Sequence, residues 1–147
     1  MNTRIQVEHP VTEMILGIDL VKEQITISEG HPLSFRQEDL VIRGFAMESR
    51  LYAENPEKDF LPSSGRIDSL ELPTGNGVRV DSGYRQGNLV EPLYDPMLAK
   101  IITSGESRDH ALQRMRCMRI RCASPSVHAH RAYAPQRIRE PTAWHSG

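Results

Sequence analysis

Polar and apolar side chains alternate at the start of the chain, and the polar ones could serve acid–base chemistry. An amide, a guanidinium, a second amide and a carboxylate stand at Asn2, Arg4, Gln6 and Glu8. On a strand these four side chains would share one face at intervals of about 6–7 Å. The arginine fork could then bind an oxyanion while the carboxylate takes up a proton. The same row could also be the solvated face of an edge strand, and the pattern alone leaves both interpretations open.

The elements that must position this row follow from its neighbours in the sequence. A strand over residues 2–8 should end at His9-Pro10, because proline has no N–H to donate to a ladder. A short helical turn over 12–16, interrupted by Gly17, and a helix from Asp19 to about residue 29 are expected next. A further helix is capped by Ser107. Between them, alternating runs predict strands over residues 45–54, 65–72, 77–81 and 97–103.

Short strands divided by turn residues are typical of a small antiparallel barrel or sandwich, so the expected fold class is α+β. The 147 residues are 38% hydrophobic and carry a net charge of −1. No run approaches the ~20 apolar residues of a membrane span, and the charge balance disfavours a dedicated nucleic-acid binder. With only two cysteines, a disulfide scaffold is excluded as well. A cytoplasmic protein without membrane or nucleic-acid partners is expected.

Composition changes sharply near residue 116. Residues 1–116 hold 13 Lys and Arg against 18 Asp and Glu, whereas residues 117–147 hold five Arg and a single acid. The second segment shows no helical or strand periodicity and contains three prolines, so it is expected to be disordered. Its cysteines, Cys117 and Cys122, precede a histidine pair, but the C-x4-C-x5-H-x-H spacing fits zinc poorly. Free thiols are the preferred interpretation.

A family resemblance is carried by the first thirteen residues, MNTRIQVEHPVTE, and by five segments that follow in order. They resemble the end of the ATP-grasp domain and the C-terminal domain of biotin carboxylases, found in acetyl-, propionyl- and methylcrotonyl-CoA carboxylases. The five segments are GIDLVKEQ (17–24), ESRLYAENP (48–56), FLPSSG (60–65), GVRVDSG (77–83) and YDPMLAK (94–100). The resemblance divides the chain into the end of an ATP-grasp domain (1–30), an incomplete C-terminal domain (31–116) and a disordered or out-of-frame tail (117–147).

The resemblance implies a ligase reaction. In the family, ATP with Mg²⁺ (or Mn²⁺) activates bicarbonate as carboxyphosphate, and the CO2 is added to N1′ of biotin on a carrier protein. This is the first half-reaction of an acyl-CoA carboxylase, which serves fatty acid metabolism among other pathways. The partners implied are a biotin carboxyl carrier protein or domain, a carboxyltransferase subunit and a second copy of the chain.

The resemblance also implies a role for individual residues. Glu8 matches the general base that deprotonates bicarbonate. Arg4 matches the arginine that grips bicarbonate, helped by Gln6 and the backbone N–H of Val7. Arg50, in the ESR motif, matches the arginine that stabilises the enolate of biotin. These residue types suit the chemistry, because a carboxylate can accept a proton while cations offset charge developing on oxygen.

The chain departs from the family pattern at both ends of the match. Asn2 matches a magnesium-site residue, but the glutamate ligand that precedes the family signature and the glycine-rich phosphate loop do not occur in this sequence. We therefore expect a fragment that is inactive alone. The match stops near Arg116, which a frameshift, a misjoined gene model or a divergent tail could each explain. Two alternatives to catalysis stay open: a module that pairs with an intact carboxylase subunit, and a truncated product without a role.

Overall fold

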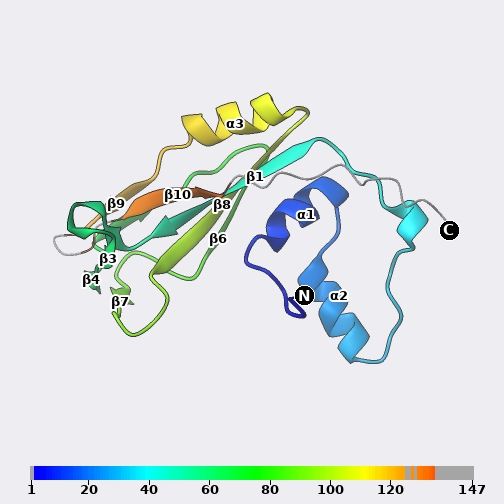
Figure 1. The fold of residues 1–147 in the computed structure, drawn as a ribbon, viewed down its shortest axis with the longest axis horizontal. Coiled ribbons are helices and arrows are strands. Elements are labelled where there is room, and N and C mark those ends of the chain that lie inside the picture. Colours follow the sequence, from blue (N-terminus) through cyan, green and yellow to red (C-terminus); the bar gives the residue numbers. More distant parts are fainter. Residues whose placement is uncertain (1, 125–126, 128, 135–147) are drawn as a thin grey trace.

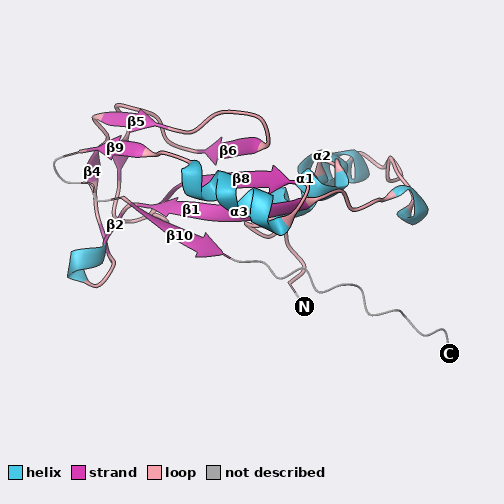
Figure 2. Ribbon diagram, turned by 90° about the horizontal axis from the view of Figure 1, so that it is seen from above, coloured by secondary structure: helices cyan, strands magenta, loops and turns pink. Residues whose placement is uncertain are grey.

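The computed structural model describes residues 2–124, 127 and 129–134, which form the helices and strands shown in Figures 1 and 2. In chain order the elements are α1 (His9–Leu16), α2 (Leu20–Ser28), the 3-10 turn η1 (Gln37–Asp39), β1 (Phe45–Tyr52), β2 (Glu54–Asn55), the 3-10 turn η2 (Pro56–Lys58), β3 (Leu61–Pro62), β4 (Gly65–Arg66), β5 (Ser69–Glu71), β6 (Val78–Ser82), β7 (Leu89–Val90), β8 (Met97–Gly105), α3 (Arg108–Cys117), β9 (Arg121–Ala123) and β10 (His130–Ala134). This is the mixed helix-and-strand architecture that the sequence predicts.

The main sheet has the strand order β10-β1-β8-β6, and each neighbouring pair is antiparallel. Strand β8 lies inside this sheet and is its most apolar member, with Leu98, Ala99, Ile101 and Ile102 all buried. A strand covered on both faces needs apolar side chains on both, which explains the nearly continuous apolar run in this part of the sequence.

The two faces of the sheet carry separate hydrophobic clusters. Ile101 packs in a cluster with Leu51 and Met115 from α3, while its neighbour Ile102 packs with Val11 and Ile15 from α1. Because successive side chains of a strand point to opposite faces, α3 and α1 cover opposite faces of the sheet. Figure 1 shows α3 along one side of the sheet and α1 on the other.

Several helix ends lie at the residues that the sequence indicates, although α1 begins at His9 rather than near residue 12. Helix α1 ends at Gly17, whose left-handed backbone (φ 71°) lets its N–H donate to the carbonyl of Glu13. Helix α2 begins after Asp19, whose side chain accepts a hydrogen bond from the N–H of Lys22 at 2.9 Å. Helix α3 is capped in the same way by Ser107, which accepts from the N–H of His110.

The prediction of a strand over residues 2–8 is wrong. This stretch is irregular and closes in a turn at Val7 and Glu8, and α1 begins directly afterwards with Pro10 in its first turn. The N–H of His9 donates to the carbonyl of Gln6, and the N–H of Val11 donates to that of Glu8. Alternation alone does not make a strand, because the backbone also needs a partner ladder. Proline suits the first turn of a helix, where its missing N–H costs nothing.

The remaining strands of the described residues form short two-stranded sheets, β2-β3, β4-β7 and β5-β9. The expected barrel or sandwich is therefore realised as several open sheets, and the described strands do not close into a barrel. None of the helices in these residues combines the length and apolar character needed to cross a bilayer.

The described residues after Arg116 differ from the expected disordered tail. Strand β9 pairs with β5, and β10 pairs with the outer edge of β1, from Glu48 opposite Ala134 to Tyr52 opposite His130. A sheet edge offers unpaired backbone N–H and C=O groups to any extended segment, whatever its side-chain periodicity. Periodicity alone could therefore not reveal these strands. Residues 125–126, 128 and 135–147 of the expected tail lie outside the described residues.

Candidate active site

Strand β1 presents a row of polar side chains on the face that α1 covers. Glu48, Arg50 and Tyr52 alternate along the strand and therefore share a face. In the antiparallel register, Arg50 stands opposite Lys100 of β8, and Lys100 stands opposite Asp81 of β6. The sheet thus places two cations and an anion side by side across three strands.

The segment that carries the candidate base docks onto this row. Glu8 Oε2 lies 3.1 Å from Arg50 Nη2, although the two residues are 42 positions apart. Lys100 Nζ donates to the carbonyl oxygen of Val7 at 3.1 Å. Farther along, Arg79 Nη1 lies 2.6 Å from Glu13 Oε2 of α1. Three side chains of the sheet therefore fix the turn at residues 7–8 and the helix that follows.

The Arg50 guanidinium lies between two carboxylates. Its Nε donates to Glu48 Oε1 at 3.0 Å, and its Nη2 donates to Glu8 Oε2. The side chain of Glu48 is fully buried, whereas that of Glu8 is 28% exposed. Burial raises the pKa of Glu48 above its usual value, against the opposing effect of Arg50. The hydrogen bonds to the Tyr52 hydroxyl and to Glu48 raise the pKa of Arg50, so the guanidinium stays charged.

Asp81 completes the charged row. Its carboxylate receives Arg79 Nε at 2.8 Å and lies 3.5 Å from Lys100 Nζ. Burial acts to raise the pKa of Asp81, but hydrogen bonding and charge from Arg79, together with Lys100, hold it below the usual value. The folded protein therefore binds the proton of Asp81 more weakly than the unfolded chain does.

This shift predicts a pH-dependent effect of Asp81→Asn on stability. Because the pKa is lowered on folding, the stabilisation is present above the unfolded value of 3.8 and is lost as pH falls through the folded value. We expect Asp81→Asn to lower the free energy of unfolding by about 1 kcal/mol at neutral pH and progressively less in acid. Urea unfolding followed by circular dichroism at a series of pH values measures the difference. Glu38→Gln, in the exposed pair with Arg36, is the control and should change little at any pH.

The candidate residues at the start of the chain line one pocket of about 560 Å³. Its lining includes Asn2, Arg4, Gln6 and Glu8, together with residues of α2 and the loop after it, such as Ile27 and Phe35. Arg4 Nη1 donates to the neighbouring carbonyl of Ile5 at 3.1 Å, and the arginine is otherwise exposed. The pocket therefore brings together the four predicted side chains, Asn2, Arg4, Gln6 and Glu8, without the strand that the sequence predicts.

Two of the predicted site residues, Val7 and Arg50, do not line this pocket. Val7 does not line the pocket, and its carbonyl oxygen is held by Lys100. Arg50 reaches Glu8 from the sheet side. His9, which the sequence interprets as structural, donates from Nδ1 to the carbonyl oxygen of Gln6 at 2.7 Å.

The described residues do not form a complete metal site. Asn2 lines the pocket, but the described part of the chain has no cluster of three or more His, Cys, Asp or Glu side chains placed to hold a metal ion. One amide oxygen falls far short of the six or so oxygen ligands of a Mg²⁺ ion. The geometry therefore supports anion binding and proton transfer at Glu8, with Asn2 as at most one contributor to a metal site.

Sequence reasoning gave no role to Glu48 or Lys100, which the structure places in direct contact with the site. The signal for Glu48 was its spacing from Arg50, since residues i and i+2 share a face on a strand. That signal becomes informative only when the covered face of β1 is known. Lys100 reaches the carbonyl of Val7 across 93 positions of sequence, and no local pattern indicates such a contact.

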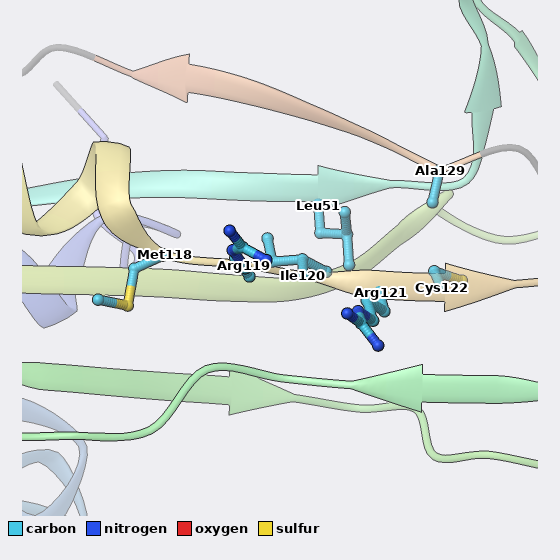
Figure 3. Close-up of a pocket in the computed structure, with 7 residues that line it drawn as sticks. All are labelled: Leu51, Met118, Arg119, Ile120, Arg121, Cys122 and Ala129. Carbon is cyan, nitrogen blue, oxygen red and sulfur yellow. The ribbon is translucent and has the colours of Figure 1, made fainter.

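A second pocket of about 440 Å³ lies between β1 and the segment that links α3 to β9 (Figure 3). Its lining includes Leu51, Ile120, Ala129 and the side chains of Arg119 and Arg121. Cys122 also lines it as a half-buried free thiol whose pKa is raised by burial. The lining contains no carboxylate that could accept a proton, so the pocket beside Glu8 is the better candidate.

Two family models match the chain. Residues 48–134 match the biotin carboxylase C-terminal domain, and residues 1–36 match the ATP-binding domain of the carbamoyl-phosphate synthase L chain. The first match covers more than half of the chain and extends past residue 116 to the end of β10.

Curated relatives agree with this match. The chain is 58% identical to biotin carboxylase from Haemophilus influenzae over 115 residues, which cover 78% of this chain and 25% of that protein. It is 53% identical to the mitochondrial propionyl-CoA carboxylase alpha chain of Mus musculus over 117 residues, which cover 78% of this chain and 16% of that protein. The chain thus spans about a quarter or less of the length of these relatives.

Solved structures share the fold. The biotin carboxylase domain of Hydrogenobacter thermophilus 2-oxoglutarate carboxylase, a dimer in complex with MgADP and bicarbonate, superposes with a TM-score of 0.80 at 43% identity, covering 88% of this chain and 28% of that one. The Kluyveromyces lactis urea carboxylase gives a TM-score of 0.77 at 37% identity, covering 87% of this chain and 11% of that one.

Proposed function

We propose that this chain, which belongs to the biotin carboxylase family, carries the bicarbonate-binding and proton-accepting side of the active site in ATP-dependent carboxylation of carrier-linked biotin. The single observation that supports this best is the contact between Glu8 and Arg50 beside a pocket lined by Arg4. A base and a cation from distant parts of the sequence meet there. That arrangement suits a reaction in which a proton leaves one oxygen and negative charge develops on another.

Glu8 accepts the proton of bicarbonate in this proposal. The O–H bond of bicarbonate breaks, a carboxyl O–H forms on Glu8, and the electron pair stays on the substrate oxygen. The partial exposure of Glu8 leaves its carboxylate within reach of a substrate in the pocket, and Arg50 fixes its orientation from the other side. A base must lie within hydrogen-bonding distance of the proton it removes, which this position at the pocket wall allows.

Arg4 binds the bicarbonate anion in the pocket, helped by Gln6; the N–H of Val7, a residue outside the pocket lining, is the third proposed donor. Arg4 is always charged, and its planar fork matches the two oxygens of a carboxylate-like anion. Arg50 offsets the negative charge that develops on the enolate oxygen of biotin. Its charge is already held in place by buried and half-buried carboxylates, so little reorganisation is needed when the reaction occurs.

In the family, ATP activates bicarbonate as carboxyphosphate, and residues 1–36 of this chain match an ATP-binding domain model. Asn2 is proposed as one contributor to the magnesium site. We propose residues 1–30 as the end of the ATP-grasp domain and residues 31–116 as the C-terminal domain; two separate family models, over residues 1–36 and 48–134, support a division into two parts. A biotinylated carrier, a carboxyltransferase and a second copy of the chain are the proposed partners.

The proposal is tested in a hybrid enzyme: Haemophilus influenzae biotin carboxylase whose matching 115-residue segment is replaced by that of this chain. We expect the hybrid to carboxylate biotin in the presence of MgATP and bicarbonate, and this chain alone to show no turnover. Lost positioning of substrates can cost ~7–11 kcal/mol of barrier, which explains the second expectation. A folded hybrid that binds ATP yet carboxylates no biotin would refute the proposal.

A second candidate function is an interaction module that pairs with an intact carboxylase subunit. Helix α2 favours it, because Val21, Ile25 and Ile27 are all between 43% and 56% exposed. Apolar side chains gathered on one helix commonly mark a contact surface. Sedimentation of this chain mixed with intact Haemophilus influenzae biotin carboxylase distinguishes the cases: a joint boundary supports the module, and two independent species contradict it.

A further inference from the structure

We propose that Glu48 is a positioning residue that holds the Arg50 guanidinium in place while Glu8 is protonated. The inference rests on the proposed function for its purpose, but its geometry and its test do not depend on catalysis. Glu48 does not line the substrate pocket and acts only through Arg50. It is therefore distinct from the residues that touch substrate.

The guanidinium uses different nitrogens for its two carboxylates. Nε donates to Glu48 Oε1 at 3.0 Å, while Nη2 donates to Glu8 Oε2 at 3.1 Å. Because the donors are separate, loss of one bond need not disturb the other. Arg50 can therefore release Glu8 and remain bound to Glu48.

The two carboxylates differ in how freely they can leave Arg50. Glu48 is fully buried on β1, which is paired on both sides by β8 and β10. Glu8 is 28% exposed and stands in a turn beside the pocket. Glu48 is thus the fixed partner of Arg50, and Glu8 is the exchangeable one.

Charge balance strengthens this asymmetry. Arg50 is the cation that hydrogen-bonds to Glu48, and the second oxygen of Glu48, Oε2, is buried without a hydrogen-bond partner among the described residues. Moving the guanidinium away would leave a buried carboxylate without its hydrogen-bonded cation, which is unfavourable. When Glu8 becomes neutral, Arg50 therefore keeps its place on Glu48, and its Nη2 is released to a developing negative charge nearby.

Hydrogen exchange at the Arg50 Nε–H tests the proposal on the full chain. In protein with ¹⁵N-labelled arginine, this resonance is identified by its loss in Arg50→Lys. We expect slow exchange with solvent in the native chain and in Glu8→Gln, and exchange at least about tenfold faster in Glu48→Gln. The Nε–H of Arg79, which donates to Asp81 at 2.8 Å, is an internal control and should stay slow in both variants.

Two results would overturn the proposal: unchanged exchange in folded Glu48→Gln, or equal acceleration in folded Glu8→Gln. If Glu48→Gln fails to fold, Glu8→Gln alone decides, because loss of slow exchange there would show that Glu8 rather than Glu48 holds the arginine. Failure of the hybrid enzyme to carboxylate biotin would refute the proposed function and leave the exchange result standing. The two failures are therefore distinguishable.

Discussion

Replacing Glu8 with Gln in the hybrid enzyme is expected to lower the rate of biotin carboxylation by about 10²–10⁴-fold, the usual contribution of a positioned general base. Glutamine has nearly the same shape but cannot take up the proton of bicarbonate. Arg50 remains paired with Glu48 in this variant, so the fold should persist. Fixation of labelled bicarbonate into biotin measures the rate, and a urea melt of the same sample measures stability.

Glu13→Gln is the matched control for this experiment. Glu13 is also paired with an arginine of the sheet, Arg79, but it does not line the pocket. If loss of a carboxylate–arginine pair were the whole cause, the two variants would slow the reaction equally. We expect Glu13→Gln to affect mainly stability, because its carboxylate also accepts the N–H of Leu20. Equal activity of Glu8→Gln and the unaltered hybrid would remove Glu8 from the mechanism.

Replacing Arg50 with Ala is expected to have two large effects. Carboxylation should fall by about 10²–10³-fold, because a preorganised cation at the developing charge is lost. Stability should fall by about 3 kcal/mol, because Glu48 is left buried without its hydrogen-bonded cation. Denaturant unfolding and steady-state kinetics on one preparation separate the two effects.

The double variant Arg50→Ala with Glu48→Gln tells these effects apart. Replacing Glu48 with Gln removes the buried charge that has lost its hydrogen-bonded cation, so most of the lost stability should return. Activity should remain low, because no guanidinium is restored to the site. Recovery of activity together with stability would mean that Arg50 serves only the fold.

Local sequence signals located three helix ends but missed the start of α1, which lies at His9 rather than near residue 12. Asp19 and Ser107 each accept the backbone N–H that their cap positions predict, and Gly17 ends α1 with a left-handed backbone. Caps depend on the residue itself and on the three or four that follow, so a short window contains what is needed. The strands around residues 45–54 and 97–103 were also located, although the first is divided into β1 and β2.

Local sequence signals could not predict which extended segments pair to form sheets. Residues 2–8 alternate like a strand but find no ladder and form a turn, whereas residues 121–123 and 130–134 lack alternation and pair with β5 and β1. In a helix the backbone finds its partners four residues away, but in a sheet it finds them at any distance. A short window therefore cannot tell whether an extended segment has a neighbour.

The sequence by itself determined the family and the types of residue available for chemistry, because the order of the motifs and the chemistry of each side chain can be read directly from it. The tertiary structure decided how those residues meet. Glu8 reaches Arg50 across 42 positions, Lys100 reaches Val7 across 93, and Glu48 becomes the fully buried partner of the arginine. The burial of these side chains, and the distances between them, depend on how β1 pairs with β8 and on the face of the sheet that α1 covers. The electrostatics of the site therefore exist only once the sheet and the helix are assembled.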